Sequence, residues 1–387
     1  MLSFEAIFWT CVLLCAYPYA LFPGLLVLLR AVRPGESLAS AHHRLPHVTM
    51  IVAACDEQDV IRAKLKNCLA QQYPRERLEI LVVTDGSRDD TCRRVRPFLK
   101  HGVRFLHQPE RAGKNHAVSR AVAAARGEVL VFSDANAMFN RRAVWHLVQP
   151  FQDERVALVA GEKRVVGSWR EAAAVDGLYW RLESWLKAQE SRHGAVMGAA
   201  GEILAVRRSR FIPPPADSII EDYILTMRQL LDGFRVVYEP RAVATELPSG
   251  SLRDEFARKT RIAAGGWQAV FRSAGLLAPR FGLVCWFFFS HRVMRWLVVP
   301  GPFLALLPLN LILLEQMPYR AIFGLQLALW GVAAFGFWRE TTGRAAGWAA
   351  APAFFVMAQL AMLAGAWRYL TRRQSAVWTR VQRASSR

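Results

Sequence analysis

The stretch that decides the fold reads Val129-Leu130-Val131-Phe132-Ser133-Asp134-Ala135-Asn136. Its apolar part is too short for an ordinary helix and is typical of a strand buried on both faces, as in a parallel sheet. Asp134 and Asn136 then lie at the carboxyl end of the strand, where open α/β sheets bind their ligands. Oxygen ligands at this spacing can chelate a hard divalent cation, which in turn can hold a diphosphate. An Asx turn that only ends the strand is the alternative interpretation.

Strands and helices alternate before this stretch. β-rich runs lie at His47–Ala54, Leu78–Thr84 and Val103–His107, and helical patterns lie between the strands at residues 60–69 and 115–125. This alternation predicts a parallel, doubly wound α/β sheet. Four acids and an amide follow the strand ends, and they predict a ligand crevice at one edge of that sheet: Asp56, Glu57, Asp85, Asp134 and Asn136.

The crevice lacks the glycine loops of two common nucleotide sites. No Gly-x-Gly-x-x-Gly follows the first strand, and no Gly-Lys-Ser or Gly-Lys-Thr occurs in the sequence. These absences disfavour a dinucleotide oxidoreductase and a P-loop NTPase. We therefore expect a crevice that binds a nucleotide through acids.

Apolar residues make up 53% of the 387 residues and are concentrated towards the two ends. Phe4–Leu29 is long enough to span a bilayer. It lacks a basic n-region and a small-residue cleavage site, so we interpret it as an anchor and not as a signal peptide. Three more apolar stretches lie near Trp296–Leu314, Ile322–Trp338 and Ala345–Trp367. The predicted organisation is a transmembrane anchor (1–32), an inserted domain (45–270), an interfacial amphipathic helix (276–292), about three transmembrane helices (293–370) and a basic tail (371–387).

The net charge of +19 is compatible with binding to nucleic acid or to a membrane surface. The arginines are spread along the chain and many flank apolar stretches, which favours the membrane over nucleic acid. Arg30, Arg33 and Arg44 follow the first span and predict that the inserted domain faces the cytoplasm. Three later spans would put the carboxyl terminus outside, whereas the arginines between 368 and 387 favour the inside, so the sequence leaves that side open.

A short aromatic run precedes the later apolar stretches. Phe281–Phe289 is too short to span a bilayer, and Arg280, Arg292 and Arg295 surround it. We expect an interfacial helix there, with its arginines on anionic lipid headgroups.

The second half of the inserted domain carries an acid pair and a pair of arginines. Glu221 and Asp222 begin a predicted helix after a run of three prolines. Arg258 and Arg261 lie three residues apart on one face of a later helix, which we expect to end at Gly265–Gln268. Charges favoured by a helix dipole and anchors to lipid headgroups are the respective alternatives.

A set of motifs, found in order over residues 48–268, resembles the family 2 glycosyltransferases of the GT-A fold. It is similar to the membrane-embedded branch that includes the cellulose, chitin, hyaluronan and poly-N-acetylglucosamine synthases. The motifs are Val52-Ala53-Ala54-Cys55-Asp56-Glu57, Val82-Val83-Thr84-Asp85-Gly86-Ser87, Gly113-Lys114, Ser133-Asp134-Ala135-Asn136, Ile220-Glu221-Asp222, the strand in Gly233–Tyr238, and Arg258–Arg261 with Trp267-Gln268.

The resemblance implies a nucleotide site at the strand ends. Asp85 matches the acid that contacts the uracil base, with Ala54 and Glu57 beside it. Lys114 matches a basic residue near the diphosphate, where a point charge is suitable. Asp134 matches the first acid of a metal-binding Asp-x-Asp motif.

The resemblance also implies roles on the acceptor side. Asp222 matches the catalytic base, with Glu221 beside it in the substrate site. Arg258 and Arg261 match the element that holds the departing diphosphate. The tryptophan expected directly after Arg261 is absent, and Trp267 is our candidate for its place.

One further departure concerns the metal. Asn136 stands where the family has a second acid, so its neutral amide is expected to bind a cation more weakly. The implied cofactor is a divalent cation, Mg²⁺ or Mn²⁺.

The implied function is inverting transfer of a sugar from a UDP-sugar to a growing polysaccharide at the inner membrane. Two alternatives remain open: transfer of a single sugar to a lipid or lipid-linked acceptor, and a non-catalytic membrane partner with a degenerate transferase domain. The implied partners are the UDP-sugar, a glycan or lipid acceptor, membrane lipids and export or synthase subunits, with no nucleic acid.

Overall fold

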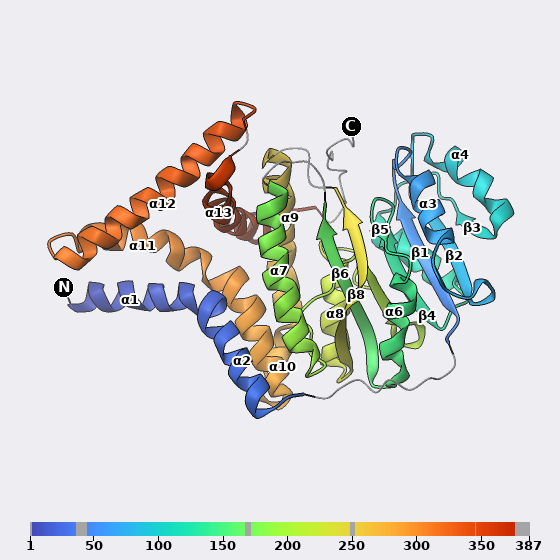
Figure 1. Cartoon of the computed structure of the whole chain (residues 1–387), viewed down its shortest axis with the longest axis horizontal. Helices are drawn as coiled ribbons and strands as arrows, with labels where there is room; N and C mark the ends of the chain where they lie inside the picture. Colours follow the sequence, from blue (N-terminus) through green and yellow to red (C-terminus); the bar gives the residue numbers. More distant parts are fainter. Residues whose placement is uncertain (1, 36–44, 167–171, 248–251, 345, 376–387) are drawn as a thin grey trace.

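The computed structural model describes residues 2–35, 45–166, 172–247, 252–344 and 346–375. A sheet flanked by helices forms one side of the molecule, and long helices from both ends of the chain gather on the other (Figure 1). Helices α7 (Ala172–Ser191) and α9 (Leu252–Arg272) lie between the two parts.

Eight strands of the described residues form one sheet in the order β3-β2-β1-β4-β7-β6-β8-β5. Their bounds are β1 Val48–Ala54, β2 Leu78–Thr84, β3 Val103–Leu106, β4 Val129–Asp134, β5 Met138–Phe139, β6 Val156–Val165, β7 Leu204–Arg207 and β8 Arg235–Glu246. The first four strands pair in parallel, β1 with both β2 and β4, and β2 with β3. β7 runs antiparallel to β4 and β6. The predicted doubly wound, mostly parallel α/β sheet is therefore confirmed, with β7 antiparallel inside it and β5 antiparallel to β8 at its edge.

Strand β1 shows why the parallel strands are apolar on both faces. Successive side chains of a strand point to opposite faces. Ile51 accordingly packs in the same core as Leu81 and Leu130, whereas Met50 and Val52 pack in the core on the other face.

Helices cover both cores. α3 (Ile61–Leu69), α4 (Thr91–Val95) and α6 (Ala143–Val148) pack on the face of Met50 and Val52. α5 (Lys114–Ala124) and α8 (Glu221–Leu231) pack on the other face. The starts of α5 and α8 thereby come close to the carboxyl end of β4.

Most of the remaining helices come from the two ends of the chain. They are α1 Leu2–Ala16, the π-helix η1 Tyr17–Leu21, α2 Phe22–Val32, α10 Leu283–Phe287, the π-helix η8 Phe288–Val298, α11 Pro300–Ile312, α12 Met317–Thr341 and α13 Ala350–Leu370. Among the described residues, three helices are long and apolar enough to cross a membrane: Ser3–Val32, Met317–Thr341 and Gly347–Leu370. The pair Leu283–Val298 and Pro300–Ile312, bent by 53°, is a fourth candidate if it counts as one span.

Helix α9 extends further than the sequence suggests. We expected it to end at Gly265, but it continues to Arg272. A Cβ at Gly266 would lie 2.5 Å from the Trp296 ring, and one at Gly265 would lie 2.9 Å from Ile220. The two glycines therefore allow close packing inside a continuous helix.

The expectation that Arg292 and Arg295 contact lipid headgroups is wrong. Their exposed fractions are 4% and 5%, and both guanidinium groups pair with Glu183 of α7. Glu183 is itself buried, and a buried carboxylate is strongly destabilising unless positive charges pair with it. The interfacial position of the preceding aromatic run stays a prediction.

Candidate active site

Asp85 follows β2 at the edge of the sheet and holds the loop between β3 and α5. Its two carboxylate oxygens accept hydrogen bonds from the backbone N–H groups of Ala112 and Gly113, both at 2.8 Å. Gly86 has a φ of +62°, and a Cβ there would lie 2.8 Å from Arg111. The loop is thus held directly against the end of β2, and it delivers Lys114 to the start of α5.

The ends of β1 and β2 lie side by side. Ala54 is in register with Thr84, so Ala54, Glu57 and Asp85 share one edge. The backbone N–H of Glu57 donates to Thr91 Oγ1 at 2.8 Å, and this bond joins the loop after β1 to the start of α4. The structure therefore brings together the three residues of the predicted uracil-binding site.

Lys114 joins the two halves of the site. Its Nζ lies 3.0 Å from Asp134 Oδ1 and 3.0 Å from Glu221 Oε1, so it bridges the end of β4 and the start of α8. Burial alone would lower the pKa of Lys114, but the carboxylates of Asp134, Glu221 and Asp222 outweigh burial and raise it well above its usual value. Lys114 is therefore a fixed positive charge.

Asp222 is held from two sides at the first turn of α8. Its Oδ2 accepts from the backbone N–H of Gly201 at 2.7 Å, and its Oδ1 accepts from the N–H of Tyr223 at 2.8 Å. A Cβ at Gly201 would lie 3.1 Å from Asp222 Oδ2, so the backbone can approach the carboxylate only because no side chain intervenes.

The two neighbouring acids differ in their electrostatics. Burial raises the pKa of Asp222, the negative charges of Glu221 and Glu202 raise it further, and the result is about 6. Burial also disfavours the charged form of Glu221, but Lys114 and Arg261 outweigh it and lower the pKa of Glu221. Adjacent carboxyl groups with opposite shifts are the pattern of a proton acceptor beside a permanently charged neighbour.

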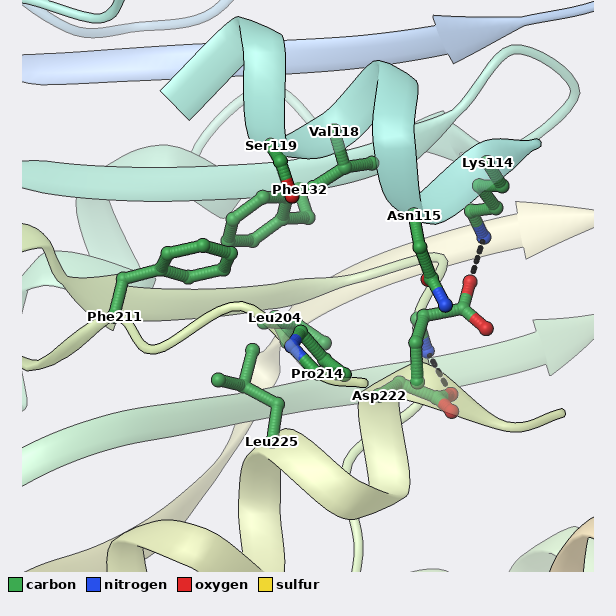
Figure 2. Close-up of a pocket in the computed structure, with 12 residues that line it drawn as sticks. Lys114, Asn115, Val118, Ser119, Phe132, Leu204, Phe211, Pro214, Asp222 and Leu225 are labelled. Atoms are coloured by element: carbon green, nitrogen blue, oxygen red, sulfur yellow. Dashed lines mark hydrogen bonds and ion pairs between the residues drawn. The ribbon is translucent and has the colours of Figure 1, made fainter. Parts of the chain in front are cut away.

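An open cavity lies beside these groups, between α5, β4 and α8 (Figure 2). Lys114 and Asp222 line its polar end. The rest of the wall is mostly apolar and includes Phe132 and Phe211, whose rings stack with centroids 5.7 Å apart. The cavity can accept a substrate that has one charged end and one apolar face.

The residues predicted to hold a departing diphosphate make different contacts in the structure. Arg261 donates to the carbonyl of Ile219 at 2.9 Å and lies near the acid pair. Arg258 pairs with Glu255 of its own helix at 2.7 Å. Trp267 packs against aromatic rings, including Tyr369 of α13 at 6.5 Å between centroids. Its described ring contacts thus lead towards α13.

The donor atoms for a metal come from the turn after β4. In the part of the chain that the structure describes, no three His, Cys, Asp or Glu residues form a group that could hold a metal ion. Asp134 contributes one partly exposed carboxylate, and Asn136 carries an amide two residues on. Such a set does not enclose an ion, but it fits Mg²⁺, which binds through one or two carboxylates and substrate phosphates and keeps several waters.

Lys64 is a supporting residue that the sequence reasoning missed. It is fully buried in α3, and its Nζ donates to Ser133 Oγ at 2.6 Å and to the carbonyl of Ala137. These bonds hold the turn that carries Asp134 from below. The signal was present in the sequence, because Lys64 lies on the apolar face of a helix between Ile61 and Leu65.

Comparison with known proteins agrees with this geometry. The sequence model of the family Glycosyl transferase family 2 matches residues 49–209. Poly-beta-1,6-N-acetyl-D-glucosamine synthase of Staphylococcus aureus (strain MSSA476) is 25% identical over 234 residues, which cover 59% of this chain and 56% of the relative. The Staphylococcus epidermidis protein of that name is 23% identical over 243 residues, 60% of this chain and 58% of the relative. The chain thus spans little more than half the length of these relatives.

A solved structure covers more of the chain. The mannosyltransferase PcManGT from Pyrobaculum calidifontis, in complex with GDP-Man and Mn²⁺, superposes with a TM-score of 0.77 at 23% identity. The match covers 96% of this chain and 100% of that one, so the shared fold includes the terminal helices.

The fold and these matches show a GT-A fold that carries a family 2 glycosyltransferase domain over residues 49–209. Over the matched residues the chain is similar to the poly-beta-1,6-N-acetyl-D-glucosamine synthases.

Proposed function

We propose that the protein transfers a sugar, with inversion, from a UDP-sugar to a growing polysaccharide at the membrane. The observation that carries the proposal is the state of Asp222, a partly buried carboxylate with a pKa of about 6 at the polar end of the cavity. A general base is most effective when its pKa is near the working pH, and it contributes roughly 10²–10⁴-fold in rate.

Transfer requires one bond to form as another breaks. An acceptor hydroxyl oxygen attacks the anomeric carbon, the bond from that carbon to the diphosphate breaks, and UDP leaves. Asp222 takes the hydroxyl proton. Lys114 and Arg261 provide positive charge near the developing charge on the diphosphate, which is the usual electrostatic contribution to phosphate departure.

A divalent cation, Mg²⁺ or Mn²⁺, completes the proposed donor site. Asp134 would hold it, with a weaker contribution from Asn136. When bound, the cation neutralises charge on the diphosphate. The carboxylate of Asp134 is available for this if Lys114 turns from it towards the phosphates.

We assign UDP-N-acetylglucosamine as the first donor to test, since the curated relatives are named for a polymer of N-acetylglucosamine. Ala54, Glu57 and Asp85 would bind the uridine. The proposed location is the inner membrane with the sheet on the cytoplasmic side, where nucleotide sugars are made. Glycan or lipid acceptors, membrane lipids, and export or synthase subunits are the proposed partners.

Transfer of a single sugar to a lipid-linked acceptor is the second candidate. The observation that favours it is the small number of candidate spans, three or at most four among the described residues. So few helices offer limited material for a glycan channel within one chain.

The test is to incubate membranes containing the protein with radiolabelled UDP-N-acetylglucosamine, UDP-glucose and GDP-mannose, and to size the products. We expect label from UDP-N-acetylglucosamine in a polymer, dependent on Mg²⁺ or Mn²⁺. Label only in a lipid extract would favour the second candidate. Label from GDP-mannose alone would contradict the proposed donor class.

A further inference from the structure

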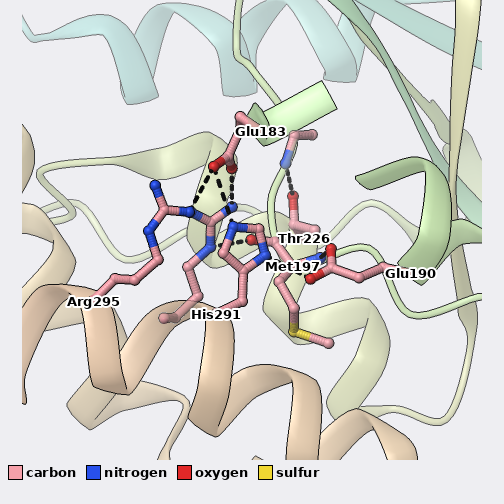
Figure 3. Close-up of polar contacts among 8 residues, drawn as sticks. Glu183, Glu190, Met197, Thr226, His291 and Arg295 are labelled. Atoms are coloured by element: carbon pink, nitrogen blue, oxygen red, sulfur yellow. Dashed lines mark hydrogen bonds and ion pairs between the residues drawn. The ribbon is translucent and has the colours of Figure 1, made fainter. Parts of the chain in front are cut away.

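A buried ion network joins the catalytic domain to the helix that leads into the membrane bundle. His291 of η8 lies between two glutamates of α7, with Nδ1 at 2.5 Å from Glu190 Oε1 and Nε2 at 3.1 Å from Glu183 Oε2 (Figure 3). Arg292 and Arg295 pair with the same Glu183 at 2.6 and 3.1 Å. All five side chains are buried, so the network lies in the protein interior and does not serve contact with solvent or lipid.

The network forms hydrogen bonds with both backbone polar groups of Met197, in an adjoining loop. The N–H of Met197 donates to Glu190 Oε2 at 3.0 Å, and the carbonyl of Met197 accepts from Arg292 Nε. The next residue, Gly198, has a φ of +134°, and a Cβ there would lie 2.9 Å from Arg292 Nη2. The loop therefore runs directly over the guanidinium group.

The same loop reaches the proposed base four residues later. The N–H of Ala199 donates to Thr226 Oγ1 at 3.3 Å, and the N–H of Gly201 donates to Asp222 Oδ2 at 2.7 Å. Thr226 in turn donates to the carbonyl of Asp222 at 2.7 Å. Every second residue from 197 to 201 is thus fixed by a side chain, first by the network and then by α8.

We propose that Arg292 is a positioning residue for Asp222. Through Met197–Gly201, its guanidinium fixes the place of the N–H that Gly201 donates to the carboxylate. The membrane-linked helix η8 thereby sets the geometry of the base. This inference rests on the proposed function, since it takes Asp222 as the base.

The chemistry of arginine suits this role. A guanidinium is a planar fork that can donate to Glu183 and to the Met197 carbonyl at the same time, whereas a lysine ammonium is a point charge on a flexible stem. The Arg292 guanidinium also lies over the ring of Tyr223, 5.6 Å from its centroid, and Tyr223 directly follows the base. Arg292 thus contacts both segments that donate to Asp222.

Helix η8 supplies a matched control. Arg295 pairs with the same glutamate three residues further on, but its guanidinium lies over Tyr19 of η1, 5.6 Å from the ring centroid. Arg292→Lys and Arg295→Lys therefore make the same chemical change at the same buried carboxylate. Only Arg292→Lys removes the guanidinium that donates to the Met197 carbonyl.

The first readout is the pH dependence of transfer by the purified full-length protein with UDP-N-acetylglucosamine, alongside KM for that donor. Arg292→Lys should lower kcat by about 10-fold to 10²-fold, the scale expected of a small misplacement of a catalytic group. Donor KM should stay unchanged. The acid limb should move to higher pH, since a carboxylate that loses a donated hydrogen bond is less stable in its charged form.

The other charges around Asp222 are the same in both variants. Four charged groups face it: Lys114 from α5, Glu202 from the second position before β7, Glu221 from α8 and Arg261 from α9. A difference between the two variants in the acid limb therefore reports the Gly201 bond. Arg295→Lys should keep the acid limb and kcat of the parent protein.

The second readout does not depend on a donor. Hydrogen exchange followed by mass spectrometry should show faster exchange of the amides between 197 and 201 in Arg292→Lys, with no such change in Arg295→Lys.

Two results distinguish failure of this inference from failure of the proposed function. If Arg292→Lys and Arg295→Lys are indistinguishable in both readouts while Asp222→Asn is inactive, Arg292 has no positioning role and the proposed function stands. If Asp222→Asn remains active, the base assignment fails, and the exchange data alone decide whether Arg292 holds the loop.

Discussion

At the residue scale, the chemistry depends on a few charges that control one another. Lys114 lies 3.0 Å from both Asp134 and Glu221, and Glu221 is the sequence neighbour of Asp222. Because Lys114 keeps Glu221 charged, Glu221 in turn raises the pKa of Asp222. A change at any one of these positions should therefore be measurable at the others.

The pH dependence of transfer follows from the pKa of Asp222. Only the ionised carboxylate can accept a proton, so kcat should fall as the pH drops through about 6 and level off above it. Glu221→Gln removes a charge that raises this pKa and should move the acid limb to lower pH. Profiles of kcat against pH at saturating donor test both expectations. An acid limb near the ordinary carboxyl value of about 4 would contradict the assignment.

Asp134 should matter more than Asn136 for metal-dependent nucleotide binding. A carboxylate brings charge to a cation, while an amide adds only a neutral oxygen. In calorimetric titrations of UDP with and without Mg²⁺, Asp134→Ala should abolish the gain that Mg²⁺ provides, and Asn136→Ala should reduce it modestly. Equal losses in the two variants would mean that the cation binds elsewhere.

At the element scale, strand ends and helix starts position the site, and close helix packing holds it. The alternation of apolar runs was enough to predict the parallel strands and to place Asp85 and Asp134 at one edge, because strand burial is a local pattern. α9 does not follow the local rule that glycines end a helix, because Gly265 and Gly266 allow it to pack closely on Ile220 and Trp296.

Gly266→Ala should destabilise the protein. The added Cβ would lie 2.5 Å from the Trp296 ring, and overpacking of this kind typically costs about 1–3 kcal/mol. The matched control is Gly324→Ala in α12, where a Cβ would meet nothing within 4 Å. Thermal unfolding in detergent should show a lower midpoint for Gly266→Ala alone. Equal midpoints would contradict the close packing of α9 on η8.

At the scale of the whole molecule, α7 and α9 lie between the sheet and the helices of the two chain ends (Figure 1), and η8 pairs with α7 through Glu183. The sequence did not reveal this connection, because Glu183 meets Arg292 across 109 positions and no local pattern marks such a pair. Basic residues beside an apolar run suggested lipid contacts, whereas a distant buried carboxylate decided their direction. Long-range charge pairing is what the sequence reasoning could not supply.

The catalytic domain should face the cytoplasm. Arg30 lies in the last turn of the first candidate span and Arg33 directly follows it, as the positive-inside rule requires. A cysteine introduced as Arg88→Cys should add no label from a membrane-impermeant maleimide in intact cells beyond that of the parent protein. It should add label after permeabilisation. Extra labelling in intact cells would place the domain on the opposite side.

The central claim is that Asp222 is the base of a family 2 glycosyltransferase, and Asp222→Asn tests it most directly. The amide keeps the size and polarity of the side chain but cannot take a proton. Transfer by the purified variant should fall by roughly 10²–10⁴-fold while UDP binding persists, and Glu221→Gln should lose less. Near-normal transfer by Asp222→Asn would contradict the account.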